Sequence, residues 1–317
     1  MAGVLDTVNQ RTQLVGQNRL ELLLFKLMGK QVYGINVFKV KEVLQCPPLT
    51  AMPKSSSVVR GVAHIRGGTI PILDLSLATG NLPIEDISDK FVVITEYNMK
   101  TQGFLVNSVE RIINMNWSEI HPPPKGAGND HFLTAVTHFE DRMVEIIDVE
   151  KILSEVSPMN VEISEGVVSE EIQKEAQEYR VLVVDDSKIA LKQTARCIEQ
   201  VGVTTHRLMD GMQAWEHLNE LLEQGIDPTE YYLMIISDIE MPEMDGYTLT
   251  AEIRNHPQLK HMFVMLHTSL SGVFNQAMVQ KVGASEFLPK FKPDDLAEIV
   301  VKRVQERGGK LTLLEDE

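Results

Sequence analysis

From Tyr179 onward, apolar strand-like runs alternate regularly with segments of helical pattern. The runs VLVVDD, VTTHRL, YYLMIISD, MFVMLHT and SEFLPK are followed by helical patterns over residues 187–201, 211–224, 246–255, 272–282 and 293–306. Strands that are apolar on both faces must be packed on both faces. Five successive β–α units achieve this by forming a parallel sheet with helices on both sides. The sequence therefore predicts a doubly wound (βα)5 domain of the α/β class over residues 179–308.

Charged and hydroxyl side chains stand at the ends of these predicted strands. The first strand ends in Asp185 and Asp186, the third in Asp238 and the fourth in Thr268, and the fifth leads into Lys290. Functional groups of a doubly wound sheet gather beyond the carboxyl ends of its strands, so we expect these five side chains at one rim. One acidic pair after a strand is usually a solvated surface feature, whereas this ordered set indicates a functional site.

The three aspartates predict a magnesium site. Carboxylates packed side by side disfavour each other's ionised form unless a cation compensates for them, and Mg²⁺ prefers carboxylate, water and phosphate oxygens. We expect Asp186 and Asp238 to bind Mg²⁺ directly, Asp185 to act through water, and the main-chain carbonyl of Glu240 to complete the site. Asp238 is also the expected nucleophile toward a phosphoryl group, because it ends the central strand opposite the lysine and the threonine.

The motifs of residues 179–308 resemble the receiver domain of response regulators, similar to CheY. The resemblance rests on VVDDS, SDIEMPEMDG, the step at Thr268 and GASEFLPK, and it covers the full length of the family's pattern. It implies that a histidine kinase phosphorylates Asp238 with Mg²⁺, that Thr268 then hydrogen-bonds a phosphoryl oxygen, and that Phe287 is the aromatic switch residue. Glu240, two residues beyond Asp238, is expected to alter the lifetime of the phosphoryl group.

Residues 19–153 have a different rhythm, in which short runs rich in Val, Ile and aromatic residues are separated by tight turns. The runs are LELLLFKL, QVYGINV, VVRGVAHI, GTIPILDL, FVVITEY, QGFLVNSVERIIN, FLTAVTHF and RMVEIIDV. Hairpins at this spacing indicate an all-β domain, an antiparallel barrel or sandwich. We expect one short helix at residues 37–44 and a loop at residues 121–130.

Three segments lie outside the two predicted domains. Residues 1–18 predict a short helical segment, and residues 309–317 a C-terminal tail. Residues 154–178 hold seven glutamates against one basic residue, Lys174, so we expect a solvated acidic linker. Its last part, SEEIQKEAQEY, is expected to form a short helix with Ser169 as N-cap.

The stretch VVRGVAHIRGGTIPILDL is the most distinctive text of the all-β region. Residues 19–153 resemble the CheW-like coupling domains of chemotaxis, through HIRGGTIPILDL and VYGINVFKVKEVL. The resemblance implies two small five-stranded β barrels with an apolar groove between them, and contacts with the histidine kinase CheA and with the cytoplasmic tips of chemoreceptors. Matched to the family's motifs, the candidate contact residues are Val40, Glu42, Gly61 and Arg66. A structural role for Arg66 inside the domain is an equally weighted alternative.

Composition excludes several other classes of protein. A formal net charge of −15 and a pI of 5.1 argue against binding to a nucleic-acid backbone or to an anionic membrane surface. No apolar run approaches the roughly 18 residues of a membrane span, so we expect no membrane insertion and a cytoplasmic protein. The two cysteines, Cys46 and Cys197, are expected to be free thiols.

A CheW-like domain followed by a receiver domain resembles the CheV-type chemotaxis coupling proteins. That resemblance implies a regulatory adaptor of receptor arrays whose coupling of receptors to CheA is tuned by phosphorylation of Asp238, and whose receiver catalyses its own dephosphorylation. Adaptation and a phosphate sink are both open as the physiological role. The alternatives are a scaffold with an inert receiver and an aspartate-nucleophile phosphatase, although the phosphatase motif DxDx[TV] is absent.

Overall fold

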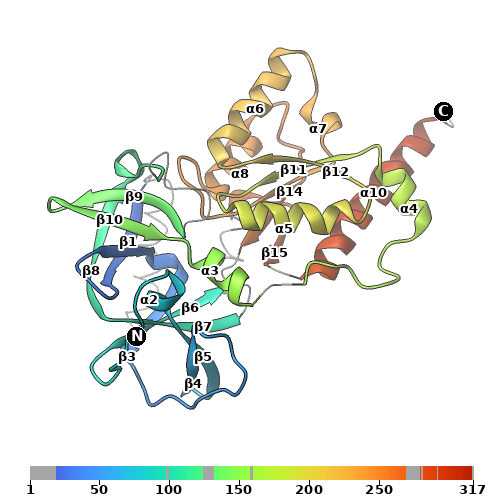
Figure 1. Cartoon of the computed structure of the whole chain (residues 1–317). Helices are drawn as coiled ribbons and strands as arrows, with labels where there is room; N and C mark the ends of the chain where they lie inside the picture. The colour runs from blue at the N-terminus through green and yellow to red at the C-terminus, as the bar shows by residue number, and fades with distance from the viewer. Residues whose placement is uncertain are drawn as a thin grey trace, which may run out of the picture. The chain divides into compact units, whose positions relative to one another are not determined.

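The computed structural model describes residues 19–97, 100–123, 132–157, 160–268, 279, 281–290 and 292–315. The helical segment predicted at residues 1–18 lies outside the described residues. The chain divides into two compact units, one of Arg19–Met159 and one that contains Asn160–Glu317 (Figure 1). Among the described helices, none combines the length and apolar composition that crossing a membrane requires.

The first unit contains two five-stranded sheets. The first sheet has the order β8-β1-β2-β10-β9, with bounds Ser108–Asn116, Arg19–Lys26, Val32–Asn36, Arg142–Ile147 and Leu133–Phe139. The second has the order β3-β6-β7-β5-β4, with bounds Val40–Gln45, Phe91–Tyr97, Lys100–Val106, Gly68–Asp74 and Val59–Ile65. All pairs are antiparallel except β2–β10 and β5–β7, which are parallel. The all-β prediction is therefore confirmed.

Each sheet curls until its two edges meet. In the second sheet, Thr50, which follows edge strand β3, exchanges two backbone hydrogen bonds of 2.9 and 2.8 Å with Val62 of the opposite edge strand β4. In the first sheet, His121, beyond edge strand β8, forms the same pair with Val136 of edge strand β9, with both bonds at 2.8 Å. Closing a small sheet in this way pairs backbone N–H and C=O groups of the edge strands that would otherwise lack partners in the sheet. The two sheets are thus barrel-like.

The helix expected at residues 37–44 is wrong. A 3₁₀ turn, η1 (Val37–Lys39), leads directly into strand β3. The residues VKEVLQ alternate between half-buried and exposed positions and pair with β6, and a period of two favours a strand. The apolar run is too short for its composition alone to distinguish the two structures.

Two other boundaries differ from the sequence prediction. The run at residues 102–114 is divided at Asn107 between strands β7 and β8. Helix α3 (Val149–Val156) follows β10, where Asp148 ends the strand by accepting a hydrogen bond from the amide of Lys151 at 2.9 Å. Asp74 acts in the same way for the short helix α2 (Leu75–Ala78).

The second unit is the predicted doubly wound domain. Its sheet has the order β12-β11-β13-β14-β15 and is parallel throughout, with bounds Thr204–Leu208, Arg180–Val184, Met234–Ser237, Val264–Thr268 and Glu286–Pro289. The main helices are α5 (Lys188–Glu199), α6 (Gly211–Glu223), α8 (Gly246–Asn255) and α10 (Pro293–Glu315), and a short helix α7 (Pro228–Tyr231) was not expected. Helices α6 and α8 pack on one face of the sheet, and α5 and α10, which contact each other, cover the other (Figure 1).

Two predicted segments of this unit differ from the structure or lie outside the described residues. Most of the helix predicted at residues 272–282 lies outside the described residues. The tail predicted to begin at residue 309 is instead helical as far as the end of α10, Glu315.

The acidic segment does not behave as a solvated linker along its whole length. The predicted short helix is confirmed as α4 (Glu170–Ala176), and Ser169 caps it by accepting a hydrogen bond from the amide of Ile172. Residues 161–176 nevertheless contact the receiver unit: Val161 and Ala176 are buried, and Gln173 donates a hydrogen bond to the main-chain oxygen of Gln200. Polar side chains with specific partners explain this docking, which composition alone does not predict.

Candidate functional site

Asp185 is held in place by bonds on both sides of the end of β11. Its main-chain amide donates to Leu208 of the neighbouring strand at 3.1 Å, and its carboxylate oxygen Oδ1 accepts from the amide of Ser187 at 2.9 Å. The hydroxyl of Ser187 in turn caps helix α5 by accepting from Ala190. The Asp185 side chain is buried, whereas that of Asp186 is half-buried.

Asp238 stands at the corresponding end of the central strand β13. Its amide donates to the main-chain oxygen of Val184 at 2.8 Å, which locks the ends of β11 and β13 side by side. The loop that follows turns back tightly, because Gly246 begins helix α8 against this same position. A Cβ atom at Gly246 would lie 2.1 Å from the main-chain oxygen of Asp238. Only glycine permits so close an approach.

Lys290 joins the two aspartates. Its Nζ lies 2.5 Å from Oδ2 of Asp185 and 3.2 Å from Oδ1 of Asp238, and the lysine side chain is 4% exposed. Its amide donates to the main-chain oxygen of Thr268 at 2.7 Å, which ties β15 to β14 at the same rim. The ends of strands β11, β13, β14 and β15 therefore meet where the parallel topology predicts.

The donor set fits a divalent cation with oxygen ligands. One carboxylate oxygen from each of Asp185, Asp186 and Asp238 lies within 4.8 Å of the others. Among the described residues, three carboxylates gather around the ammonium of Lys290 in a largely buried place, and a hard cation such as Mg²⁺ would compensate for their negative charge. The side chain of Glu240 is half-buried and lies two residues beyond Asp238.

The two predicted switch residues lie in neighbouring strands. Thr268 is buried at the end of β14 and pairs in register with Pro289, two residues from Phe287 on β15. Phe287 is half-buried against a small apolar cluster that includes Tyr247 and Leu266. Burial within that cluster raises the pKa of the Tyr247 hydroxyl.

A buried histidine next to the site has no assigned role in the sequence prediction. His267 precedes Thr268 and is 1% exposed. Burial, and then the nearby charge of Lys290, hold the pKa of His267 well below its usual range. The imidazole is therefore neutral at pH 7 and adds no positive charge to the pocket.

In the first unit, two of the four predicted contact residues form a surface ion pair. The Arg66 guanidinium binds the Glu42 carboxylate through Nε at 2.9 and 3.0 Å and through Nη2 at 2.7 Å. The Arg66 side chain is 79% exposed, and its backbone has a positive φ of 49° in the turn between β4 and β5. This pair links β3 to the hairpin of β4, the two strands at opposite edges of the sheet.

The other two predicted contact residues lie further inside. Val40 packs against the core of the unit. Gly61 is buried at a bulge of β4 with φ of 146°, and a Cβ there would lie 2.5 Å from the main-chain oxygen of Thr50. Gly61 therefore permits the backbone pairing that closes the barrel.

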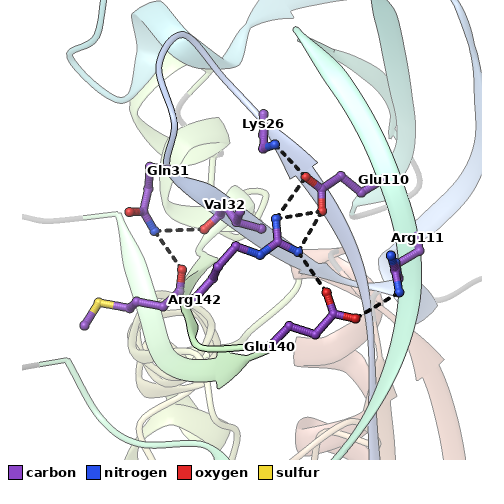
Figure 2. A network of polar contacts seen from close by, with 8 residues as sticks. Lys26, Gln31, Val32, Glu110, Arg111, Glu140 and Arg142 are labelled. Atoms are coloured by element: carbon purple, nitrogen blue, oxygen red, sulfur yellow. Dashed lines mark hydrogen bonds and ion pairs between the residues drawn. The ribbon is translucent and has the colours of Figure 1, made fainter.

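A second polar network, on the first sheet, was not predicted (Figure 2). Glu110 of β8 accepts from Lys26 of β1 at 2.8 Å and from Arg142 of β10 at 3.2 Å. Glu140 accepts from Arg111 at 3.2 Å and lies 3.7 Å from Arg142. Hydrogen bonds from Lys26 and then Arg142 lower the pKa of the Glu110 carboxyl. Charges so far apart in the chain meet only through strand register, so no local motif indicates them.

Comparisons with known proteins agree with this architecture. The family model of the CheW-like domain matches residues 21–157, and that of the response regulator receiver domain matches residues 181–301. Chemotaxis protein CheV3 of Helicobacter pylori is 30% identical, over 90% of this chain and 94% of its own length. Chemotaxis protein CheV1 of the same organism is also 30% identical, over 95% of this chain and 98% of its own length.

Among solved structures, the scaffolding protein TtCheW from Thermoanaerobacter tengcongensis matches 40% of this chain and 88% of its own, at 26% identity and a TM-score of 0.38. The full-length similarity to the two Helicobacter proteins, together with a CheW-like unit that precedes a receiver unit, identifies the family. The chain belongs to the CheV family and is a chemotaxis coupling protein with a receiver domain.

Proposed function

We propose that this protein couples chemoreceptors to the histidine kinase CheA, and that phosphorylation of Asp238 regulates the coupling. The observation that carries the proposal is the position of Lys290 between Asp185 and Asp238, with three carboxylates gathered within 4.8 Å. A structural ion pair needs only one carboxylate for each lysine. A cluster of three carboxylates around one ammonium is what a site for a cation and a phosphoryl group requires.

The proposed reaction is transfer of a phosphoryl group from a phosphohistidine of the kinase. A carboxylate oxygen of Asp238 forms a bond to phosphorus, and the bond from phosphorus to the imidazole nitrogen breaks. The imidazole keeps the electron pair and takes up a proton from solvent. Lys290 offsets the charge of the phosphoryl oxygens, and the hydroxyl of Thr268 donates a hydrogen bond to one of them.

Asp185, Asp186, Asp238 and the main-chain carbonyl of Glu240 would hold Mg²⁺. When bound, the ion would offset the charge of the phosphoryl oxygens and of the clustered carboxylates. The receiver's own residues would also support dephosphorylation, in which a water oxygen bonds to phosphorus, the bond from phosphorus to the Asp238 oxygen breaks, and a proton of the water passes to solvent, which leaves inorganic phosphate and the Asp238 carboxylate. The side chain of Glu240, near the path of that water, would set the rate.

The first unit would supply the contacts with the receptor tips and with CheA. Arg66 and Glu42 form an exposed pair that would be available to a partner, while Val40 and Gly61 would maintain the shape of the contact surface. The protein would be cytoplasmic and would join receptor arrays through these contacts. Family membership supports this assignment.

The experiment that tests the function is reconstitution of receptors, CheA and this protein, with kinase activity as the readout. Beryllofluoride with Mg²⁺ would imitate the phosphoryl group on Asp238. In an adaptation mechanism, beryllofluoride changes kinase activity in the wild-type assembly and leaves an Asp238→Asn assembly unchanged. In a sink mechanism, kinase activity stays constant while phosphoryl groups drain through Asp238. Failure to join the receptor–kinase assembly would refute the coupling function.

A further inference from the structure

Residues 161–164 of the acidic segment, here called the strap, are bonded to the C-terminal end of helix α5. The amide of Ile163 donates to Oε1 of Gln200 at 3.1 Å, and Nε2 of Gln200 donates to the main-chain oxygen of Val161 at 2.9 Å. Gln200 is the C-cap residue of α5, and Val161 is buried. One side-chain amide thus satisfies two backbone groups of the strap, as a neighbouring strand would.

The strap is bonded equally to the start of helix α10. Ser164 donates to Asp294 twice, from its amide to Oδ1 at 2.8 Å and from its hydroxyl to Oδ2 at 2.7 Å. These two bonds, first from the amide and then from the hydroxyl, lower the pKa of the Asp294 carboxyl. Asp294 lies in the first turn of α10. The strap therefore bridges α5 and α10 and requires both helices in their present relative positions.

Helix α5 begins next to the acidic site, and helix α10 begins shortly after Lys290 in the chain. Helix α5 follows Asp185 and Asp186 after the single capping residue Ser187. Helix α10 begins at Pro293, shortly after Lys290, and is thereby connected to the site by a few residues. The bonds of the strap are satisfied while Lys290 lies between Asp185 and Asp238. A movement of Lys290 toward phosphoryl oxygens would shift the start of α10 relative to α5.

The neighbouring helix α4 is attached more firmly. Ala176 is fully buried, and Gln173 donates to the main-chain oxygen of Gln200 at 3.2 Å. Gly202, with φ of 113°, lets α4 approach so closely that a Cβ there would lie 2.5 Å from the main-chain oxygen of Gln173. Packing of this kind resists small shifts more strongly than a few hydrogen bonds do. Helix α4 also contacts α10, but near Gly308, whereas Ser164 of the strap is bonded to the first turn of α10. A shift of that first turn would therefore release the strap before α4.

We propose that the strap docks on α5 and α10 and that phosphorylation of Asp238 releases it. This inference rests on the proposed function of Asp238 and adds the means by which the phosphorylated site would act on the rest of the chain. Release of the strap would free residues 161–168 from the surface of the receiver unit, which adds eight residues to the connection that follows α3. A flexible chain of eight residues has a root-mean-square reach of about 16 Å.

Hydrogen exchange of the full-length protein, with and without Mg²⁺ and beryllofluoride, tests the inference. Formation of the beryllofluoride complex is followed separately by ¹⁹F NMR, with Asp238→Asn as the variant that cannot form it. We expect the amides of Ile163 and Ser164 to exchange roughly five- to tenfold faster in the complex, the effect of losing one hydrogen bond each. Amides of α4 should keep their protection.

Two variants of α10 provide a matched comparison. Asp294→Ala removes both acceptors of Ser164 and should accelerate its exchange without beryllofluoride. Asp295→Ala, in the same turn, removes a partner of Lys292 and should leave the strap unchanged. Because coupling between two sites is reciprocal, Asp294→Ala should also bind beryllofluoride more tightly by the same factor by which the complex loosens the strap.

The possible results separate the two proposals. A complex that forms without any change at Ile163 and Ser164 would overturn the strap and leave the phosphorylation site standing. Equal exchange in Asp294→Ala and Asp295→Ala would also overturn it. No complex in the wild-type protein would overturn the phosphorylation of Asp238, and the release of the strap with it.

Discussion

Replacement of Lys290 by methionine should strongly destabilise the receiver unit. The ammonium lies 2.5 Å from Asp185 and 3.2 Å from Asp238, and the three side chains are 4%, 4% and 11% exposed. At an effective dielectric constant of about 20, these attractions amount to about 7 and about 5 kcal/mol. Desolvation of the ammonium offsets several kcal/mol, so Lys290→Met should lower the free energy of unfolding by about 3–5 kcal/mol.

Urea unfolding followed by tryptophan fluorescence measures this loss. The chain has two tryptophans, and the change Trp117→Phe leaves Trp215 of helix α6 as the reporter of the receiver unit. With a urea dependence of about 2 kcal/mol per molar, the midpoint should fall by about 1.5–2.5 M. Added Mg²⁺ should recover part of the loss, because the cation binds the carboxylates only in the folded unit.

Lys292→Met is the matched control. Lys292 is 51% exposed and pairs with Asp295 at 3.0 Å on the surface, so its loss should cost no more than about 0.5 kcal/mol. If Lys290→Met and Lys292→Met shift the midpoint equally, Lys290 does not neutralise a buried carboxylate cluster. A shift in Lys290→Met that Mg²⁺ leaves unchanged would refute the cation site.

Three further predictions concern other residues. Glu240→Ala should change the dephosphorylation rate of the phosphorylated receiver, measured by loss of radiolabel, and an unchanged rate would remove Glu240 from the mechanism. Arg66→Ala should change stability by less than about 1 kcal/mol, because its pair with Glu42 is exposed, yet weaken cosedimentation with receptor and kinase; a large loss of stability would instead assign Arg66 to the fold. Glu110→Gln should destabilise the first unit by about 1 kcal/mol at pH 7. Since the folded-state pKa of Glu110 is lowered, its contribution is present above the unfolded-state pKa of about 4.3 and is lost as pH falls through the folded-state pKa, so urea midpoints of the two proteins should converge in acid.

The receiver unit was predictable because its topology determines which residues meet. Once the strands are parallel, the residue after each strand lies at one rim, so Asp185 and Asp238 can be placed together from strand ends alone. The bond between Lys290 and Asp185 follows from the same rule. No role could be predicted for His267, because a histidine at the end of a strand has no distinctive pattern until its burial is known.

The first unit was less predictable, because pairing between distant strands decides its details. The alternation of VKEVLQ can be recognised as that of a strand only once its pairing with β6 is known. The ion pair of Arg66 with Glu42 and the network around Glu110 depend on barrel closure and on strand register, which no local spacing reveals. Docking of the strap escaped prediction for a similar reason, since Ser164 and Asp294 are far apart in the chain.

The most direct test of the central claim is phosphoryl transfer from radiolabelled, phosphorylated CheA to this protein in the presence of Mg²⁺. The wild-type protein should become labelled and the kinase should lose label at the same rate, while Asp238→Ala should remain unlabelled and leave the kinase phosphorylated. Removal of Mg²⁺ by a chelator should abolish labelling of the wild type. Absence of label on the wild-type protein, with its binding to receptor and kinase intact, would contradict the claim and identify a scaffold with an inert receiver.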